Sequence, residues 1–195
     1  MKEIILEKAF SLFIEKRFNG VSMNQIQTEA KVSRGAIYHH FKSKESIYAE
    51  VINKYLIRAL SVVTRIAENQ KTSLYKAILA AIDERKQIIH EMRSISTTPI
   101  TDLNYFKLIY DACDFYEGFT TKITIINNRE IEEWKKIIQN AIDNNEINPD
   151  SDIDFVANNF VFMPQAIGMK YSFSGNINIE ELRAMYLRFY ELLKI

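Results

Sequence analysis

The side chains best suited to bind a polar partner gather in one short segment of the chain. Residues 33–44 contain Arg34, Tyr38, His39, His40 and Lys44. Basic and hydroxyl-bearing side chains at this density can donate hydrogen bonds to phosphate oxygens and to the edges of bases. A metal site is the alternative, but adjacent histidines on a helix point in different directions and do not converge on one ion. The segment predicts contact with nucleic acid, and we expect no metal and no other cofactor.

Three serines are spaced to begin three successive helices around this segment. Ser22 stands three residues before Gln25, which is the pattern of a capping box, and Ser33 and Ser43 precede further helical patterns. A first amphipathic helix over residues 2–17 comes before them and ends near Gly20. The predicted helices then run from Ser22 to Ala30, over residues 34–41, and from Ser43 to about residue 68.

Residues 22–41 fit a helix-turn-helix whose second helix enters the major groove of DNA. Arg34 can contact guanine, and Gly35 and Ala36 are small enough to let the backbone approach the bases. Tyr38 and His40 can donate to phosphates, and Lys44 begins the next helix, where an ammonium and a backbone amide can hold one phosphate. The inward set is predicted to be Ile26, Ala30, Val32, Ile37 and Phe41. The predicted DNA-contacting residues are Ser22, Asn24, Ser33, Arg34, Gly35, Ala36, Tyr38, His39, His40 and Lys44.

The tail of this segment, Gly35-x-x-Tyr38-x-His40-Phe41-x-x-Lys44-x-x-x-Tyr48, resembles the TetR family of bacterial repressors. The resemblance implies a homodimer on a palindromic operator, with phosphate contacts from Tyr38, His40 and Lys44. The turn residue, usually glycine in that family, is Lys31 here, and a left-handed lysine costs about 1 kcal/mol.

Charge is distributed unevenly along a chain of zero net charge. Residues 1–58 hold 10 Lys and Arg against 6 Asp and Glu, and the rest holds 15 against 19. A basic N-terminal part on a slightly acidic body is what a DNA-binding head requires. We expect an all-α fold of about nine helices: a three-helix DNA-binding domain over residues 1–46 and a helical ligand-sensing and dimerisation domain over residues 47–195.

The body is predicted from four further patterns. A helix is expected over residues 72–92, and residues 94–104 have the composition of a loop. Residues 104–127 are expected to be helical but interrupted at Gly118, and residues 130–144 form a separate helix that begins with an acidic cluster. An apolar helix follows over residues 153–173, kinked at Pro164, and Asn178 caps the last helix.

Aromatic residues of the body can line a ligand pocket, and they fit an ordinary core equally well. The predicted pocket residues are Phe106, Tyr110, Phe115, Phe119, Trp134 and Met163. The last two helices are apolar enough to need cover from a partner subunit, which would form a four-helix bundle. The predicted dimer interface contains Phe160, Ile167, Tyr171, Leu182, Met185, Tyr186 and Phe189. Cys113, the single cysteine, is interpreted as a small buried hydrophobic residue rather than a redox sensor.

The sequence therefore predicts a transcriptional repressor that binds double-stranded DNA as a homodimer and is released by an unknown small-molecule effector. The alternative is an architectural or division-linked DNA binder without an effector. An enzyme is not expected, because no phosphate loop, HExxH motif or carboxylate pair is present. A single cysteine and the absence of a long apolar segment predict a cytoplasmic protein without a membrane span.

Overall fold

Residues 1–96, 98–173 and 178–195 are described by a computed structural model of the chain. The α-helices are α1 (Lys2–Lys16), α2 (Met23–Ala30), α3 (Arg34–His40), α4 (Lys44–Val51), α5 (Arg58–Leu60), α6 (Leu74–Ile95), α7 (Asp102–Phe115), α8 (Phe119–Asp143), α9 (Ile153–Ser172) and α10 (Ile179–Leu193). A π-helical segment, η1 (Ile52–Ile57), joins α4 to α5, and η2 (Val63–Arg65) and η3 (Glu68–Gln70) are short 3-10 turns. Within these residues there is no strand, and the predicted all-α fold is confirmed.

The three serines cap α2, α3 and α4 as predicted. We call helices α1 to α4 the head of the protein. Ser22 Oγ accepts from the Gln25 amide, and the Gln25 side chain accepts in return from the Ser22 amide at 2.8 Å. Ser33 caps α3 by accepting the Ala36 amide, and Ser43 caps α4 in a second reciprocal pair with Ser46. Lys31 takes the left-handed conformation at the turn, with φ 53° and ψ 41°. Local hydrogen bonds therefore fix the geometry of the helix-turn-helix.

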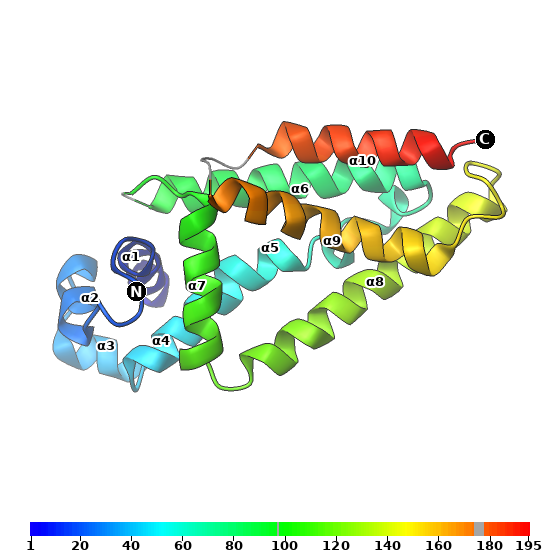
Figure 1. Ribbon diagram of the computed structural model, residues 1–195. Helices are drawn as coiled ribbons and strands as arrows, with labels where there is room; N and C mark the ends of the chain where they lie inside the picture. The colour runs from blue at the N-terminus through cyan, green and yellow to red at the C-terminus, as the bar shows by residue number, and fades with distance from the viewer. Residues whose placement is uncertain (97, 174–177) are drawn as a thin grey trace.

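A continuous helical segment made of α4, η1 and α5 leads from the head into the body (Figure 1). We call this segment the lever helix. The prediction that it reaches residue 68 is wrong, because it ends at Leu60. The amides of Val63 and Thr64, which would continue the helix, donate instead to the two carboxylate oxygens of Glu130 on α8.

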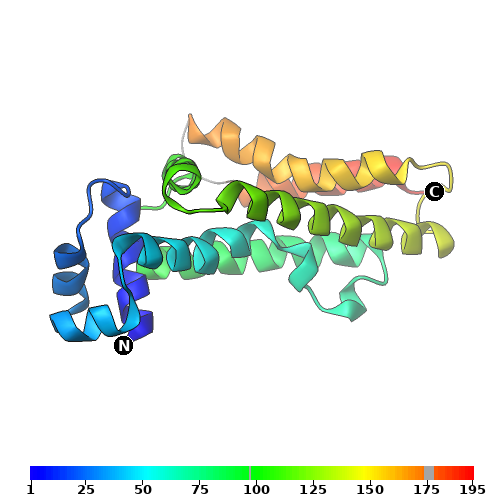
Figure 2. The same ribbon diagram turned by 90° about the horizontal axis from the view of Figure 1, so that it is seen from below.

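The long helices α6, α8, α9 and α10 form the body and run along its length, while α7 crosses them beside the head (Figure 1). Figure 2, turned by 90°, shows α7 end-on between the head and the long helices. α7 packs against α1 and α4 of the head and also against α8 and α9 of the body. It therefore stands at the junction of the two parts.

The expected division of residues 104–144 is corrected by the structure. The break falls at Tyr116–Gly118, where Gly118 has a φ of 76°, and one helix then runs from Phe119 to Asp143. Glu130 consequently lies in the middle of α8 rather than at a helix start. Pro164 lies inside α9, which continues to Ser172, and Asn178 caps α10 as predicted.

Candidate DNA-binding face and ligand cavity

The outer face of α3 brings the predicted base- and phosphate-contacting residues together. Arg34, Gly35, Tyr38 and His39 are exposed, and Ala36 and His40 are partly exposed. The guanidinium of Arg34 lies 5.9 Å from the centre of the Tyr38 ring, on the same side of the helix. The opposite side of the motif is buried: Ile26 and Ile37 are fully buried, and Ala30 and Phe41 nearly so. The amphipathic pattern of the sequence thus leaves one polar face open.

Gly35 occupies a position where the fold does not need a glycine. A Cβ atom built there meets nothing within 4 Å, and its backbone is part of a regular helix. Gly20 is the opposite case, because a Cβ there would lie 2.3 Å from the Lys16 carbonyl oxygen. The space over Gly35 lies outside the protein, on the face that the sequence assigned to DNA.

The other predicted contact residues have roles in the head itself. The side chains of Ser22 and Ser33 accept amide hydrogen bonds as caps, and Asn24 is exposed in the first turn of α2. The Lys44 ammonium donates to the carbonyl oxygens of Phe18 and Val21, at 2.9 and 2.8 Å. It also lies 4.0 Å from the centre of the Phe18 ring. Lys44 therefore holds the loop after α1, a role that the sequence did not reveal.

The head is fastened to α7 by a buried carboxylate. Asp111 accepts from the Phe18 amide at 3.0 Å and forms an ion pair with Arg17. Arg17 has a φ of 60° and a ψ of 174°, a conformation that favours glycine and costs a side-chain-bearing residue about 1–3 kcal/mol. The hydrogen bond to Asp111 is the main cause of the raised pKa of the Arg17 guanidinium. The pair keeps the end of α1 in a conformation that it would not adopt alone.

Two further hydrogen bonds join the head to the same face of α7. Tyr48 donates to the Leu108 carbonyl oxygen at 2.7 Å, and Asn104 donates to the Ile14 carbonyl oxygen at 3.0 Å. Burial is the main cause of the raised pKa of Tyr48, so this hydroxyl stays protonated. These partners are 60 and 90 residues apart in the sequence, and no local pattern indicates them.

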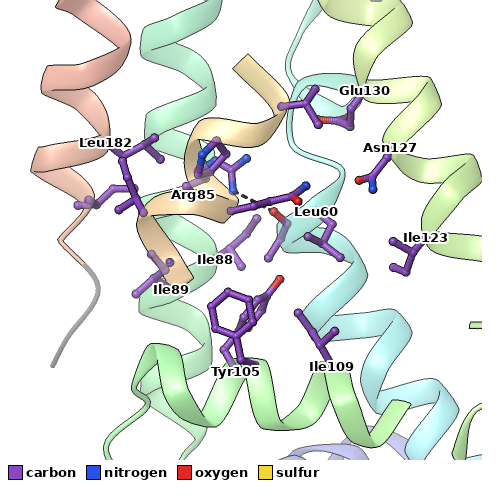
Figure 3. Close-up of a pocket in the computed structure, with 18 of the residues that line it drawn as sticks. Leu60, Arg85, Ile88, Ile89, Tyr105, Ile109, Ile123, Asn127, Glu130 and Leu182 are labelled. Atoms are coloured by element: carbon purple, nitrogen blue, oxygen red, sulfur yellow. Dashed lines mark hydrogen bonds between the residues drawn. The ribbon is translucent and has the colours of Figure 1, made fainter. Parts of the chain in front are cut away.

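The body contains a cavity of about 410 Å³ between the lever helix and α6–α10 (Figure 3). Phe106, Phe119 and Trp134 line it, as the sequence predicted. The other three predicted residues do not. Tyr110 points to solvent, Phe115 stacks on Phe18 at a centroid distance of 4.2 Å, and Met163 packs against the core outside the cavity lining.

The lining is mostly aliphatic and aromatic, with two charged side chains on opposite walls. Figure 3 shows Arg85 reaching in from α6 and Glu130 from α8. Arg85 Nη1 donates to the Ala59 carbonyl oxygen at 3.1 Å, near the end of the lever helix. Cys113 lies at the cavity edge and is exposed, so the expectation that it is a small buried hydrophobic residue is wrong.

Most of the predicted dimer-interface residues face the inside of their own subunit. Phe160, Ile167, Leu182 and Tyr186 are at most 7% exposed, because they pack around Trp134 and the cavity. Tyr171 and Phe189 are partly buried, and only Met185 is exposed. Apart from Met185, the exposed apolar residues of α9, of its C-cap and of α10 are not among the predicted ones. These exposed residues are Phe155, Phe162, Met169, Phe173, Met185 and Leu192.

The rings of His39 and His40 stand nearly perpendicular, 5.1 Å apart. In the described part of the chain, no group of three or more His, Cys, Asp or Glu residues could hold a metal ion. Among the same residues, no helix combines the length and the apolar character that crossing a membrane requires.

Comparison with known proteins identifies relatives of the head and of the whole fold. The family profile described as "Bacterial regulatory proteins, tetR family" matches residues 5–51. The HTH-type transcriptional regulator YuxN of Bacillus subtilis is 32% identical over 111 residues, which are 52% of this chain and 37% of YuxN. The HTH-type transcriptional repressor KstR2 of Mycolicibacterium smegmatis is 24% identical over 195 residues, covering 95% of this chain and 86% of KstR2.

The solved structure of the TetR family regulator PfmR from Thermus thermophilus has the same fold. It superposes with a TM-score of 0.67 at 19% identity, covering 96% of this chain and 97% of PfmR. The matched head, the relatives and the fold agree with the motif from Gly35 to Tyr48. Residues 5–51 therefore resemble bacterial regulatory proteins of the tetR family, the chain has the fold of a solved TetR-family regulator, and these likenesses support a DNA-binding transcriptional regulator.

Proposed function

We propose that the protein is a repressor that binds a palindromic operator as a homodimer and is released when a small molecule fills the cavity. Residues 1–46 would act as the DNA-binding unit and residues 47–195 as the sensing and dimerisation unit. Because its DNA partner is the bacterial chromosome, the proposal puts the protein in the cytoplasm.

One observation carries the ligand-release part of this proposal. The helix α7 lines the cavity through Tyr105, Phe106 and Ile109, and it holds the head through Leu108 and Asp111. A ligand that favours a different position of α7 would therefore also favour a different position of the head. The coupling equals the difference in ligand affinity between the two positions, typically about 1–3 kcal/mol.

The geometry of DNA explains why a small head movement matters. Two heads must stand about 34–36 Å apart to enter successive major grooves on one side of the duplex. A dimer with the wrong spacing loses one of its two sets of contacts. We therefore propose that the effector acts on head spacing and leaves the contact residues of α3 unchanged.

The dimer contact that we propose uses the outer faces of α9 and α10. Phe155, Phe162 and Met169 recur every seven residues along α9, and Met185 and Leu192 do so along α10. Two such stripes from each subunit fit the four-helix bundle typical of paired helices. A patch of large apolar side chains on the surface marks an interaction site when it is continuous.

Sedimentation analysis of Phe162→Glu tests the dimer, because this side chain is 49% exposed in the single subunit and its loss should not unfold it. Wild type should sediment as a dimer and the variant as a folded monomer. Ile125→Glu, an exposed apolar residue of α8, serves as the matched control and should remain dimeric. A Phe162→Glu variant that stays dimeric would rule out this interface.

Selection of binding sites from random DNA tests the function as a whole. A repressor of this kind should enrich one palindrome whose half-sites are about one helical turn apart. Genome-wide binding should then show one or a few sites. Many scattered sites without a common palindrome would favour the architectural alternative.

A further inference from the structure

The cavity holds an arginine whose hydrogen-bonding capacity is only partly used. Arg85 has no carboxylate within 4.0 Å among the side chains that the structure describes. Its Nε atom is buried and has no hydrogen-bond partner there. A guanidinium offers five N–H donors in a planar fork, and leaving a buried donor unpaired is unfavourable. Arg85 also lies within hydrogen-bonding reach of the Tyr186 hydroxyl, so the donor that is left unpaired on this positive group in the cavity wall is its Nε–H.

Glu130 is the negatively charged side chain of the same cavity, and its carboxylate oxygens already accept hydrogen bonds from the protein. Both carboxylate oxygens of Glu130 accept backbone amides, from Val63 at 2.8 Å and from Thr64 at 2.9 Å. Glu130 is 3% exposed. The unpaired hydrogen-bonding group of the cavity is thus a donor on a positively charged side chain. It favours a ligand group that accepts hydrogen bonds and carries negative charge, and it does not favour a cation.

The remaining lining is apolar. Ile88, Ile109, Ile123 and Leu182 come from four different helices and surround the space beside Arg85 (Figure 3). From this combination we infer that the effector is an apolar carboxylate, with an aliphatic or aromatic body in the cavity and its carboxylate on the fork of Arg85. Planar two-point pairing of this kind is characteristic of arginine and carboxylate.

The position of Arg85 also links this ligand to the lever helix. In an uninterrupted helix the Val63 amide would donate to the Ala59 carbonyl oxygen, four residues earlier. Here Glu130 takes the Val63 amide and Arg85 takes the Ala59 carbonyl. Two cavity side chains therefore replace one hydrogen bond of the helix and end it at Leu60. A carboxylate that draws Arg85 away from Ala59 changes the end of the lever helix. This second step rests on the proposed function.

Three eight-carbon probes test the ligand class on the full-length protein: octanoate, 1-octanol and octylamine. Binding is measured by calorimetry and by the fluorescence of Trp134, the single tryptophan, which lines the cavity. Octanoate should bind at least about tenfold more tightly than the other two, since a hydrogen bond to a charged group contributes that much. Equal or tighter binding of octanol or octylamine, or no binding of octanoate, would overturn the inference.

The variant Arg85→Gln keeps a neutral amide donor but removes the charge and the fork. It should lower octanoate affinity about tenfold and leave octanol affinity unchanged. Arg65→Gln is the matched control, because Arg65 pairs with Glu84 outside the cavity lining. An Arg85→Gln protein that still prefers octanoate refutes the assignment. If this variant does not fold, the ranking of the three probes on wild type still decides.

Gel-shift titrations on the selected operator separate this inference from the proposed function. Octanoate should release wild type from DNA and should not release Arg85→Gln. If octanoate binds through Arg85 and DNA affinity does not change, the link to the lever helix is wrong. If no operator can be selected, the proposed function fails while the octanoate preference stands on its own. If DNA binds and the probes are not distinguished, only the ligand class fails.

Discussion

Replacing Gly35 with alanine should make the protein more stable and a weaker DNA binder. The added Cβ meets nothing within 4 Å, so it causes no clash inside the head. Alanine in a helix is more favourable than glycine by about 0.5–1 kcal/mol, because it restricts the unfolded chain. For a domain of this size, each kcal/mol raises the melting temperature by about 2–4 °C, so we expect a gain of about 1–4 °C.

The effect on DNA should have the opposite sign. If α3 lies in the major groove with Gly35 against the bases, the methyl group occupies space that the DNA needs. A loss of about tenfold in operator affinity corresponds to about 1.4 kcal/mol. A higher melting temperature together with a lower operator affinity separates this explanation from a general loss of structure, which would lower both the melting temperature and the affinity.

Gly20→Ala provides the contrast in the same head. Its Cβ would lie 2.3 Å from the Lys16 carbonyl oxygen, so the melting temperature should fall. Thermal unfolding followed by circular dichroism and titration of a fluorescent operator measure both quantities. A Gly35→Ala protein with unchanged operator affinity would refute the close approach of α3 to DNA. One with lower stability would refute the open geometry around Gly35.

Three other substitutions test the head and its junction with α7. Lys44→Ala should lower the free energy of unfolding by about 2 kcal/mol, because two carbonyl oxygens lose a charged donor. If Lys44 also contacts a phosphate, the slope of log DNA affinity against log salt concentration should become shallower by about one unit in this variant. An unchanged slope would exclude the phosphate contact. Asp111→Ala should cost about 2 kcal/mol by urea unfolding, since the Phe18 amide and Arg17 lose their partner; its neighbour Asp114 is exposed, and an equal loss in Asp114→Ala would contradict the argument. Tyr38→Phe should keep the melting temperature and weaken binding to all DNA sequences by about threefold or more through one lost phosphate contact; a loss confined to the operator would instead indicate a base contact.

The head could be predicted from the sequence because its determinants are local. Ser22, Ser33 and Ser43 each bond an amide three residues further on, and the spacing of these pairs is visible in the chain. The left-handed Lys31 follows from its place in the same motif. A hydrogen bond over three residues is fixed once the helix begins, so the sequence pattern and the structure agree there.

The lever helix shows where local reasoning fails. Its apolar pattern continues past Leu60, but Glu130, about 67 residues further along the chain, accepts the amides of Val63 and Thr64. Such a carboxylate competes with helix continuation only after the chain has folded. The same long range explains why no sequence pattern indicated the contacts of Asp111 and Tyr48.

Most residues predicted for the dimer interface pack inside the single subunit, and the sequence did not indicate this for a different reason. The last helix carries two apolar stripes, one through Leu182 and Tyr186 and one through Met185 and Leu192. Periodicity identifies both stripes but does not indicate which one packs inside the subunit. The structure decides this through Trp134, which stacks on Phe160 and fills the interior.

The fastening of the head to α7 has a consequence for building chimeric regulators. A cut after residue 46 separates Arg17 and Phe18 from Asp111, and it separates Ile14 from Asn104. A head transplanted in this way loses the surface of α7 that fits it. The unit that exchanges cleanly between regulators is therefore discontinuous in sequence: the first four helices together with the head-facing positions of α7. A graft that carries Asn104, Leu108 and Asp111 along with the head should transmit the signal of its new body, while a graft cut at the linear boundary should bind DNA without responding.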